Sequence, residues 1–292
     1  MHRHVHAGAG LSRSGIWRRR PFEGHEETKV APPDRGLLRV LSLWAGIIVA
    51  GLVILILASF LTDRALVASD ANAQVEVRVT AHQWWWRIEY RDPAEQNAWI
   101  ETANEMHLPV DQTARVHLVS GDVIHSFWVP NLAGKMDVIP GKNNALALTP
   151  RRTGWFRGQC TEFCGVQHAH MGLDVKVETA AEFTSWLERQ KQEARQPTAD
   201  PVASRGQEIA TGGACGLCHV IKGTAATGRA GPDLTHVASR RSLAAGTLPM
   251  SRGGLQGWIA QPQALKPGNM MPTIPLDPAD ADAVAHYLST LQ

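Results

Sequence analysis

The chain of 292 residues has little net charge and few cysteines. Its formal net charge is +2, and no basic run alternates with aromatic residues in the regions predicted to fold, so no nucleic-acid partner is expected. Four cysteines occur as two pairs, Cys160 with Cys164 and Cys215 with Cys218. Each pair lies inside a cofactor-like motif, so no cysteine is left for a disulfide framework.

The N-terminal region lacks a sustained hydrophobic period until residue 37. Residues 1–36 are polar and rich in glycine and proline, which predicts a disordered tail. No ionisable residue then occurs from Val40 to Leu61. Because about 20 helical residues cross the ~30 Å hydrocarbon layer, residues 37–62 are predicted to form one transmembrane helix. A cleaved signal peptide is the alternative, but this apolar run exceeds the usual core of such a signal.

The charges around this span predict its orientation, because the side richer in Arg and Lys stays in the cytoplasm. Asp63, Arg64 and Asp70 follow the span. The arginines that precede it are Arg18, Arg19, Arg20, Arg35 and Arg39. We therefore expect a single-pass membrane protein with the N-terminus in the cytoplasm and everything after residue 62 outside.

Short β-strand signals recur over residues 74–195, which are predicted to form the first folded domain. Residues 75–80 alternate apolar and polar side chains, as a half-buried strand does. Glycine and proline separate the segments and, with their shortness, predict an antiparallel sandwich or barrel. A capping box of Thr179 and Glu182 then predicts a closing helix. The other strand signals cover residues 114–119, 144–148, 154–157 and 173–177.

The densest group of metal-binding side chains lies within residues 160–171. Soft sulfur ligands with nitrogen select copper over hard cations. A mononuclear blue copper site needs one cysteine, so Cys160 and Cys164 together suggest two bridging thiolates and a dinuclear centre. Three alternatives are a disulfide, a tetrahedral zinc site with His125 and His168, and a mononuclear blue site. Zinc gives no reason for Met171, and a mononuclear site leaves one cysteine idle.

The spacing Cys160-x-Glu162-x-Cys164-x-x-x-His168-x-x-Met171, with His125 upstream, resembles the CuA site of cytochrome c oxidase subunit II. Residues 81–86 and 135–141 extend the resemblance, which covers roughly residues 75–190. It implies a cupredoxin fold and a dinuclear copper centre with two bridging thiolates, one imidazole on each copper, and two weak ligands. The implied bridging thiolates are Cys160 and Cys164, and the implied imidazoles are His125 and His168. The implied weak ligands are Met171 and the Glu162 carbonyl.

The resemblance also assigns roles to residues around the copper loop. The Glu162 side chain is implied to help hold Mg or Mn at the boundary with subunit I, and a carboxylate suits such a hard cation. Trp84 is implied to be the place where electrons enter. His170 competes with His168 as the nitrogen ligand, but the spacing after Cys164 favours His168.

Four further polar residues near these motifs are left open by the sequence. Asp122 and Asp137 are as well suited to tuning the copper site or attracting a basic electron donor as to ordinary turn and surface roles. His107 and His117 lie outside the motif and are expected to be structural or exposed.

The C-terminal region carries a second cofactor signature. Cys215-Gly-Leu-Cys218-His219 is the attachment motif for c-type haem, in which two thioethers hold the porphyrin and the histidine is the proximal ligand. Residues 266–272 resemble the methionine-ligand loop of small cytochromes c, whose ligand directly precedes a proline, and this implies Met271. Residues 203–292 are therefore predicted to be an all-α cytochrome c domain after a linker at residues 196–202.

The predicted chain is thus multidomain: one transmembrane helix, an all-β cupredoxin-like sandwich and an all-α cytochrome c domain. The resemblance implies the electron-transfer subunit of a haem–copper terminal oxidase. Electrons would pass from a donor, such as a cytochrome c or a cytochrome bc complex, through haem c and CuA to subunit I, which with subunit III completes the enzyme. Oxygen reduction and proton pumping belong there, so no catalytic residue is expected in this chain.

Two alternative functions remain at this point. One is the electron-transfer subunit of a nitric oxide reductase, and the other is a membrane-anchored redox carrier or sensor without a catalytic partner. The chain departs from the family in showing one transmembrane helix where two are usual. A slightly acidic copper domain and a slightly basic haem domain favour docking of the two, because complementary fields guide encounter.

Overall fold

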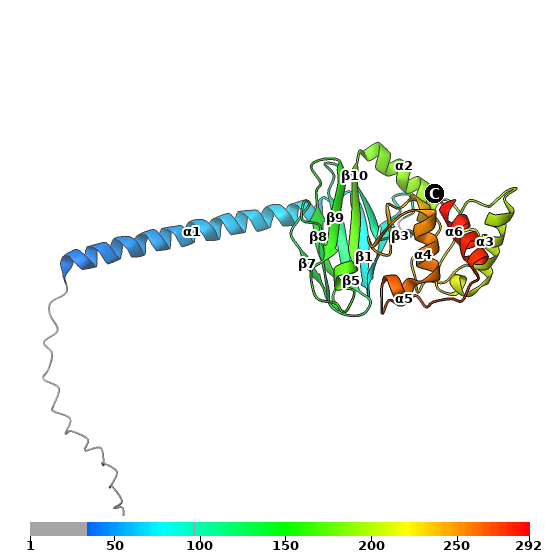
Figure 1. Cartoon of the computed structure of the whole chain (residues 1–292). Coiled ribbons are helices and arrows are strands. Elements are labelled where there is room, and N and C mark those ends of the chain that lie inside the picture. The colour runs from blue at the N-terminus through cyan, green and yellow to red at the C-terminus, as the bar shows by residue number, and fades with distance from the viewer. Residues whose placement is uncertain (1–33, 96) are drawn as a thin grey trace, which may run out of the picture. The chain divides into compact units, whose positions relative to one another are not determined.

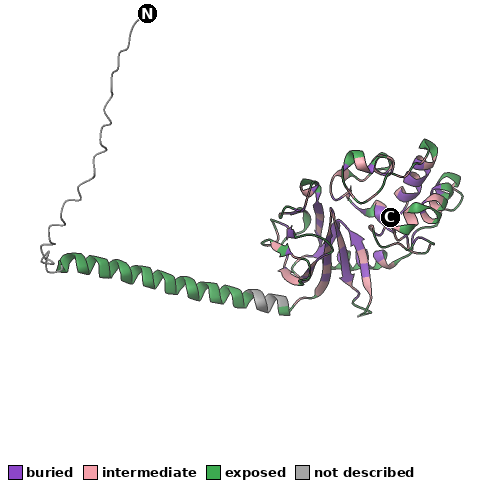
Figure 2. Cartoon of the chain, turned by 90° about the horizontal axis from the view of Figure 1, so that it is seen from below, coloured by how far each residue is buried: buried purple, intermediate pink, exposed green. Residues whose placement is uncertain are grey.

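A computed structural model describes residues 34–95 and 97–292, without the side chains of residues 66–70. Nearly all of the predicted tail, residues 1–36, lies outside the described residues. The first helix, α1 (Arg35–Ala71), contains the predicted span (Figure 1). Residues 35–65 are exposed and form the one helix in the described part of the chain that is long and apolar enough to cross a membrane (Figure 2). An exposed apolar helix of this length indicates a membrane-anchored protein.

The middle of the chain is a β-sandwich of two five-stranded sheets, with strand orders β3-β2-β1-β5-β8 and β4-β10-β9-β6-β7 (Figure 1). The cupredoxin-like sandwich predicted from the sequence is therefore confirmed. The first sheet contains β1 (Val75–His82), β2 (Trp85–Arg91), β3 (Trp99–Ala103), β5 (Ala114–Ser120) and β8 (Asn144–Leu148). The second contains β4 (Glu105–Pro109), β6 (His125–Trp128), β7 (Met136–Val138), β9 (Gly154–Cys160) and β10 (Gly172–Glu178).

The strand pairing differs from the predicted antiparallel arrangement in two places. Strand β1 pairs with β5 in parallel, and β4 pairs with β10 in parallel. Parallel neighbours need a long crossover connection. Strands β2 to β4 supply that connection between β1 and β5, which the local alternation of residues 75–80 and 114–119 cannot reveal.

A helix covers one end of the sandwich, as the capping box predicted. In α2 (Ala180–Lys191) the Thr179 hydroxyl accepts from the Glu182 amide, and the Glu182 carboxylate accepts from the Thr179 amide. Two orphan amides at the start of the helix are thereby satisfied. The buried face of α2 consists of Phe183, Trp186, Leu187 and Gln190.

The C-terminal region is mainly helical, as predicted, with helices α3 (Pro201–Gly212), α4 (Arg252–Ala260), α5 (Pro262–Leu265) and α6 (Pro278–Ser289). A small ribbon of β11 (Ser242–Leu243) and β12 (Leu248–Pro249) was not predicted. Its turn contains Ala244 and Ala245 at φ values of 51° and 59°, in the left-handed region that few non-glycine residues adopt. Residues of that turn contact the β-sandwich, as described below.

Helices α3 and α6 cross at Gly206, where no side chain fits. A Cβ added there would lie 2.0 Å from the Ala283 carbonyl oxygen, which is backbone and cannot move aside. We expect Gly206→Ala to destabilise the haem-binding region by about 3 kcal/mol through overpacking, measured as a lower midpoint of thermal unfolding. Gly257→Ala in α4 is the matched control, because nothing lies within 4 Å of its added Cβ. Equal stability of the two variants would contradict the prediction.

Candidate metal centre and haem site

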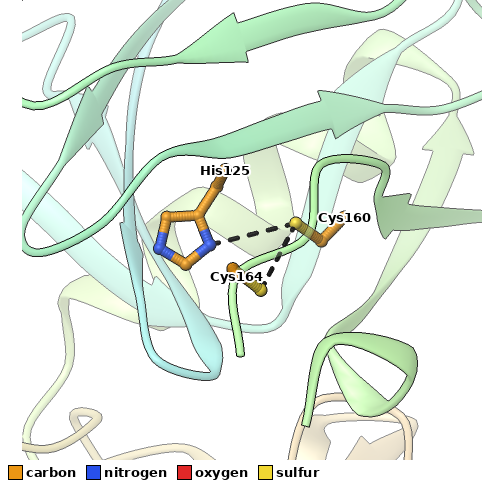
Figure 3. A group of neighbouring side chains, drawn as sticks. All are labelled: His125, Cys160 and Cys164. Carbon is orange, nitrogen blue, oxygen red and sulfur yellow. Dashed lines mark hydrogen bonds between the residues drawn. The ribbon is translucent and has the colours of Figure 1, made fainter. Parts of the chain in front are cut away.

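Strand register brings the predicted copper residues together. Strand β6 begins at His125 and pairs with the end of β9, where Phe127 lies opposite Cys160. The loop after Cys160 returns to its own start, because the Cys160 amide donates to the Met171 carbonyl over 3.1 Å. Figure 3 shows the resulting group of His125, Cys160 and Cys164, whose candidate ligand atoms all lie within 4.8 Å of one another.

All six predicted copper ligands lie in one cluster. The Cys160 Sγ atom is 3.9 Å from His125 Nδ1 and 3.2 Å from the Glu162 carbonyl oxygen. The Cys164 Sγ atom is 3.6 Å from His168 Nδ1 and 3.9 Å from Met171 Sδ. Each sulfur therefore has one imidazole and one weaker donor beside it. This donor set fits copper, and Met171 would have no role at a zinc site.

The two cysteine sulfurs are neighbours without a bond between them. Cys160 Sγ and Cys164 Sγ lie 3.8 Å apart, whereas a disulfide needs about 2.05 Å. Their mutual hydrogen bond lowers the pKa of Cys160 and raises the pKa of Cys164. One thiolate is thus favoured at neutral pH, and a thiolate is the form that binds metal. The geometry favours shared metal binding over the disulfide interpretation.

Asp122 fixes the orientation of the His125 ring. Its carboxylate accepts from His125 Nε2 over 2.8 Å, which directs Nδ1 of the fully buried imidazole toward Cys160. The same carboxylate accepts from the backbone amides of Gln83 and Val123. A carboxylate behind a metal-binding histidine sets its tautomer and its basicity. The sequence left Asp122 and Asp137 equal, and the structure distinguishes them, because the Asp137 side chain is exposed.

We expect Asp122→Ala to weaken copper binding by ~10- to 100-fold, the usual effect of losing a carboxylate that orients a metal-binding histidine. Competition of copper-loaded protein with a chelator would measure the change. Asp137→Ala removes an exposed carboxylate on the neighbouring strand β7 and should leave copper affinity unchanged. Similar affinities for both variants would show that Asp122 does not support the site.

The two histidines of the loop have different partners. Nδ1 of His168 faces Cys164, whereas Nδ1 of His170 hydrogen-bonds the Gln167 amide oxygen over 2.7 Å. This arrangement favours His168 as the nitrogen donor. The Glu162 carbonyl lies beside Cys160 while its side chain is exposed. That carboxylate is thus free of the copper cluster.

Trp84 is linked directly to the copper loop. Its indole Nε1 donates to the Cys164 carbonyl oxygen over 2.9 Å, and the neighbouring Gln83 side chain donates to the same oxygen over 2.7 Å. Gly165 permits this approach, since an added Cβ would lie 2.9 Å from the Trp84 ring. Trp86 is buried and packs edge-on against Phe127. The first tryptophan therefore contacts the loop, and the third fills the core.

The haem-attachment motif is folded as a c-type haem would require. Nδ1 of His219 donates to the Pro232 carbonyl over 2.7 Å, which leaves Nε2 as a ligand for iron. Gly231 packs against this ring, where an added Cβ would lie 2.5 Å from the imidazole. Burial lowers the pKa of His219 and so favours the neutral, ligating form. The Cys215 and Cys218 thiols are half-buried and unpaired, as thioether formation needs.

Met271 is held by backbone hydrogen bonds and is less exposed than its neighbour Met270. Its amide donates to the Asn269 side chain over 2.8 Å, and its carbonyl accepts from Gln263 Nε2 over 2.8 Å. Met271 is half-buried, whereas Met270 is 83% exposed. This difference agrees with the choice of the methionine that directly precedes Pro272.

One residue of this region was missed by the sequence reasoning. Lys266, in the loop leading to Met271, is only 2% exposed and donates to three backbone carbonyls, among them that of Trp84. Lysine is almost never fully buried, so no general rule predicts this position. The single available signal was its place at the start of the methionine-ligand loop.

Comparison with known proteins decides the family. A family model described as "Cytochrome C oxidase subunit II, periplasmic domain" matches residues 93–178, and one described as "Cytochrome c" matches residues 203–292. The chain is 30% identical to cytochrome c oxidase subunit 2 of Bacillus sp. (strain PS3) over 287 residues, covering 91% of this chain and 78% of that protein. The chain belongs to the cytochrome c oxidase subunit 2 family.

A second relative agrees with this membership. Cytochrome c oxidase subunit 2 of Alkalihalophilus pseudofirmus is 35% identical over 219 residues, which cover 75% of this chain but only 61% of that protein. The chain thus spans about three fifths of that relative's length. The crystal structure of the periplasmic domain of subunit II of cytochrome oxidase of Bradyrhizobium japonicum is 35% identical, covers 41% of this chain and 94% of its own, and aligns with a TM-score of 0.38.

Membership of this family agrees with the electron-transfer subunit of an oxidase that the sequence led us to expect. It also favours an oxidase over the nitric oxide reductase and the carrier or sensor without a catalytic partner. The two matched domains imply copper in the sandwich and haem in the helical region.

Proposed function

We propose that this subunit receives electrons from a cytochrome c or a cytochrome bc complex and passes them to subunit I of a haem–copper terminal oxidase. Covalent haem c and dinuclear CuA would supply the two redox centres within this chain. Oxygen reduction to water and proton pumping would occur in the partner subunits, I together with III. The chain's own residues bind and orient these groups and keep water away from them.

The observation that supports the copper assignment is the pair of cysteine sulfurs 3.8 Å apart, with an imidazole nitrogen beside each. Two copper ions would be held by the Cys160 and Cys164 thiolates and by the His125 and His168 imidazoles, with Met171 and the Glu162 carbonyl as weaker donors. Both cysteines, His125 and Met171 are buried. Donor atoms held by a rigid sandwich need little rearrangement when an electron arrives.

A haem would be attached through thioethers to Cys215 and Cys218, and His219 and Met271 would ligate its iron. The hydrogen bond from His219 Nδ1 to Pro232 supports this assignment, because it fixes the ring with Nε2 available. Histidine with methionine raises the haem potential, as a carrier near the oxygen end of a respiratory chain requires.

The surroundings of the copper loop suggest how this subunit contacts its partner. The exposed Glu162 carboxylate would contribute to a Mg or Mn site shared with subunit I, since hard cations prefer oxygen ligands. Trp84, hydrogen-bonded to the Cys164 carbonyl, is the proposed point of electron entry. The single span α1 would anchor the chain in the bacterial inner membrane, with the N-terminus in the cytoplasm and both folded domains on the periplasmic side.

Paramagnetic resonance of the full chain, loaded with haem and copper in detergent, would test the proposal. We expect two copper ions per chain that share one unpaired electron, together with a low-spin haem. Copper analysis that found one ion per chain, or a high-spin haem with a free axial position, would contradict the assignment.

A further inference from the structure

Lys266 joins the haem-ligand loop, residues 266–272, to the copper loop, residues 160–171. It follows α5, five positions before Met271, and its ammonium donates to the carbonyl oxygens of Trp84, His170 and Ala244. The three N–O distances are 2.8, 2.8 and 3.0 Å. An ammonium has three donors and no acceptor, so these carbonyls satisfy it completely. We call this cluster of one ammonium and three carbonyls the Lys266 junction.

The three carbonyls come from three separate segments. Trp84 lies between β1 and β2 next to the copper loop, His170 belongs to the copper loop itself, and Ala244 lies in the turn of the β11–β12 ribbon. Ala244 and Ala245 both adopt the left-handed conformation, which is retained only where surrounding contacts hold it. The Ala245 carbonyl also accepts from the Gly172 amide at the end of the copper loop, over 2.9 Å.

A second side chain reinforces the junction from the opposite direction. Gln167, buried within the copper loop, donates through Nε2 to the Pro267 carbonyl over 2.8 Å. Its amide oxygen accepts from His170 Nδ1. The copper loop thus donates a hydrogen bond to the haem-ligand loop at Pro267. The preceding residue, Lys266, donates in the opposite direction, from the haem-ligand loop to the copper loop.

Stability alone gives little reason for a lysine here. Burial lowers the pKa of Lys266 to about 7, which reflects the cost of removing an ammonium from water. No carboxylate pairs with it among the residues that the structure describes. An apolar side chain of similar length would avoid that cost, but it would leave the three carbonyls without this donor. The ammonium also has a geometric effect. Its three hydrogen bonds hold the two loops in a single relative position.

We propose that Lys266 is a positioning residue for electron transfer, which holds the Met271 loop against Trp84 and the copper loop and so fixes the path from haem to copper. The path runs from the Met271 loop through the Lys266 side chain to Trp84, and through the Trp84 Nε1 hydrogen bond to the Cys164 carbonyl. This inference rests on the proposed function, since it concerns the same two centres.

The test uses full-length chain in detergent, loaded with haem and copper, and compares Lys266→Met with Lys222→Met. Lys222 is a matched control, because its ammonium also donates from the haem domain to a backbone carbonyl next to the sandwich. The acceptor is the Gln190 carbonyl, 3.0 Å away, and this contact lies away from the copper loop. The first readout is the rate of copper reduction after rapid reduction of the haem. The second is hydrogen–deuterium exchange of residues 82–86, 163–172 and 242–248.

For Lys266→Met we expect the internal rate to fall about tenfold or more, because positioned reactions lose up to ~100-fold when the reacting groups shift by ~1 Å. Exchange in the three segments should rise, while the spectra of both centres and direct reduction of copper by a small external reductant stay unchanged. Lys222→Met should keep the wild-type rate and the wild-type exchange in these segments.

An internal rate within twofold of wild type, with unchanged exchange, would overturn the inference. If Lys266→Met does not fold, Lys266→Gln replaces it, since the shorter amide retains only part of the hydrogen bonding and should give an intermediate rate. A wild-type rate in Lys266→Gln would then overturn the inference. If wild-type protein itself moves no electrons from haem to copper, the proposed function fails, and exchange still decides whether Lys266 holds the loops together.

Discussion

Replacing Cys164 with serine is expected to abolish the two-copper centre. The Cys164 sulfur lies between the other predicted donors, 3.8 Å from Cys160 Sγ, 3.6 Å from His168 Nδ1 and 3.9 Å from Met171 Sδ. A serine hydroxyl is a hard donor and stays protonated at neutral pH, so it cannot bridge two copper ions as a thiolate does. We expect copper affinity to fall by more than ~100-fold, since loss of an orienting partner alone costs ~10- to 100-fold.

Copper content, the shared-electron resonance signal and the haem spectrum would be measured together on the full chain. The expected result is at most one copper per chain and no shared electron, with a normal low-spin haem. Phe163→Leu is the control in the same loop, because that side chain is 74% exposed and lies outside the proposed ligand set. Two copper ions with an unchanged signal in Cys164→Ser would show that Cys164 does not bridge them.

The copper site was accessible to sequence reasoning because five of its six candidate ligands lie within twelve consecutive residues. The sixth, His125, starts the strand that pairs with the end of β9. The supporting groups were less accessible. For Asp122 the sequence left a tuning role at the copper site and an ordinary turn role equally open, and the structure places it 2.8 Å from His125 Nε2. Lys266 was hidden for a different reason, since its three acceptors are backbone carbonyls that carry no sequence identity.

The fold shows the same limit. Strands β1, β5, β8, β9 and β10 were predicted from short apolar or alternating segments that glycine and proline separate along the chain. Strand β4 was not, since all of Glu105–Pro109 is buried, including Glu105 and His107. Buried charged groups break the hydrophobic pattern on which strand prediction depends. They are tolerated because partners from elsewhere in the chain satisfy them, and these partners become visible only in the folded protein.

His107 is the centre of this buried polar cluster in β4. Its Nδ1 lies 2.8 Å from Glu178 Oε1 and its Nε2 lies 3.0 Å from Glu105 Oε1, while its ring stacks on Trp186 at 4.0 Å. Glu105 accepts in addition from the Arg241 amide, which precedes the β11–β12 ribbon. The sequence predicted a structural or exposed histidine, and the structural alternative is confirmed. Because both carboxylates are buried with it, the protonated imidazole offsets part of their negative charge.

Replacing His107 with leucine should therefore lower the free energy of unfolding by about 3–5 kcal/mol, the usual cost of removing one partner from a buried ion pair. Burial alone would lower the pKa of His107, but the hydrogen bonds to Glu105 and Glu178 outweigh it and raise the pKa above its ordinary value. The stabilisation by the protonated ring is thus fully present below pH ~6.5 and is lost as pH rises through the raised pKa. The stability difference between wild type and His107→Leu should be larger at pH 6 than at pH 9.

Thermal unfolding of both proteins at the two pH values would measure this difference. His117→Leu provides the control, because His117 lies in the neighbouring sheet, is partly exposed and, among the described residues, pairs with one carboxylate, that of Glu76 at 3.2 Å. Such a pair contributes less than ~1 kcal/mol, so this variant should unfold near the wild-type temperature at both pH values. His107→Leu could instead prove as stable as His117→Leu, or its loss of stability relative to wild type could grow toward pH 9. Either result would mean that the His107 ring is neutral and that packing on Trp186 holds the cluster.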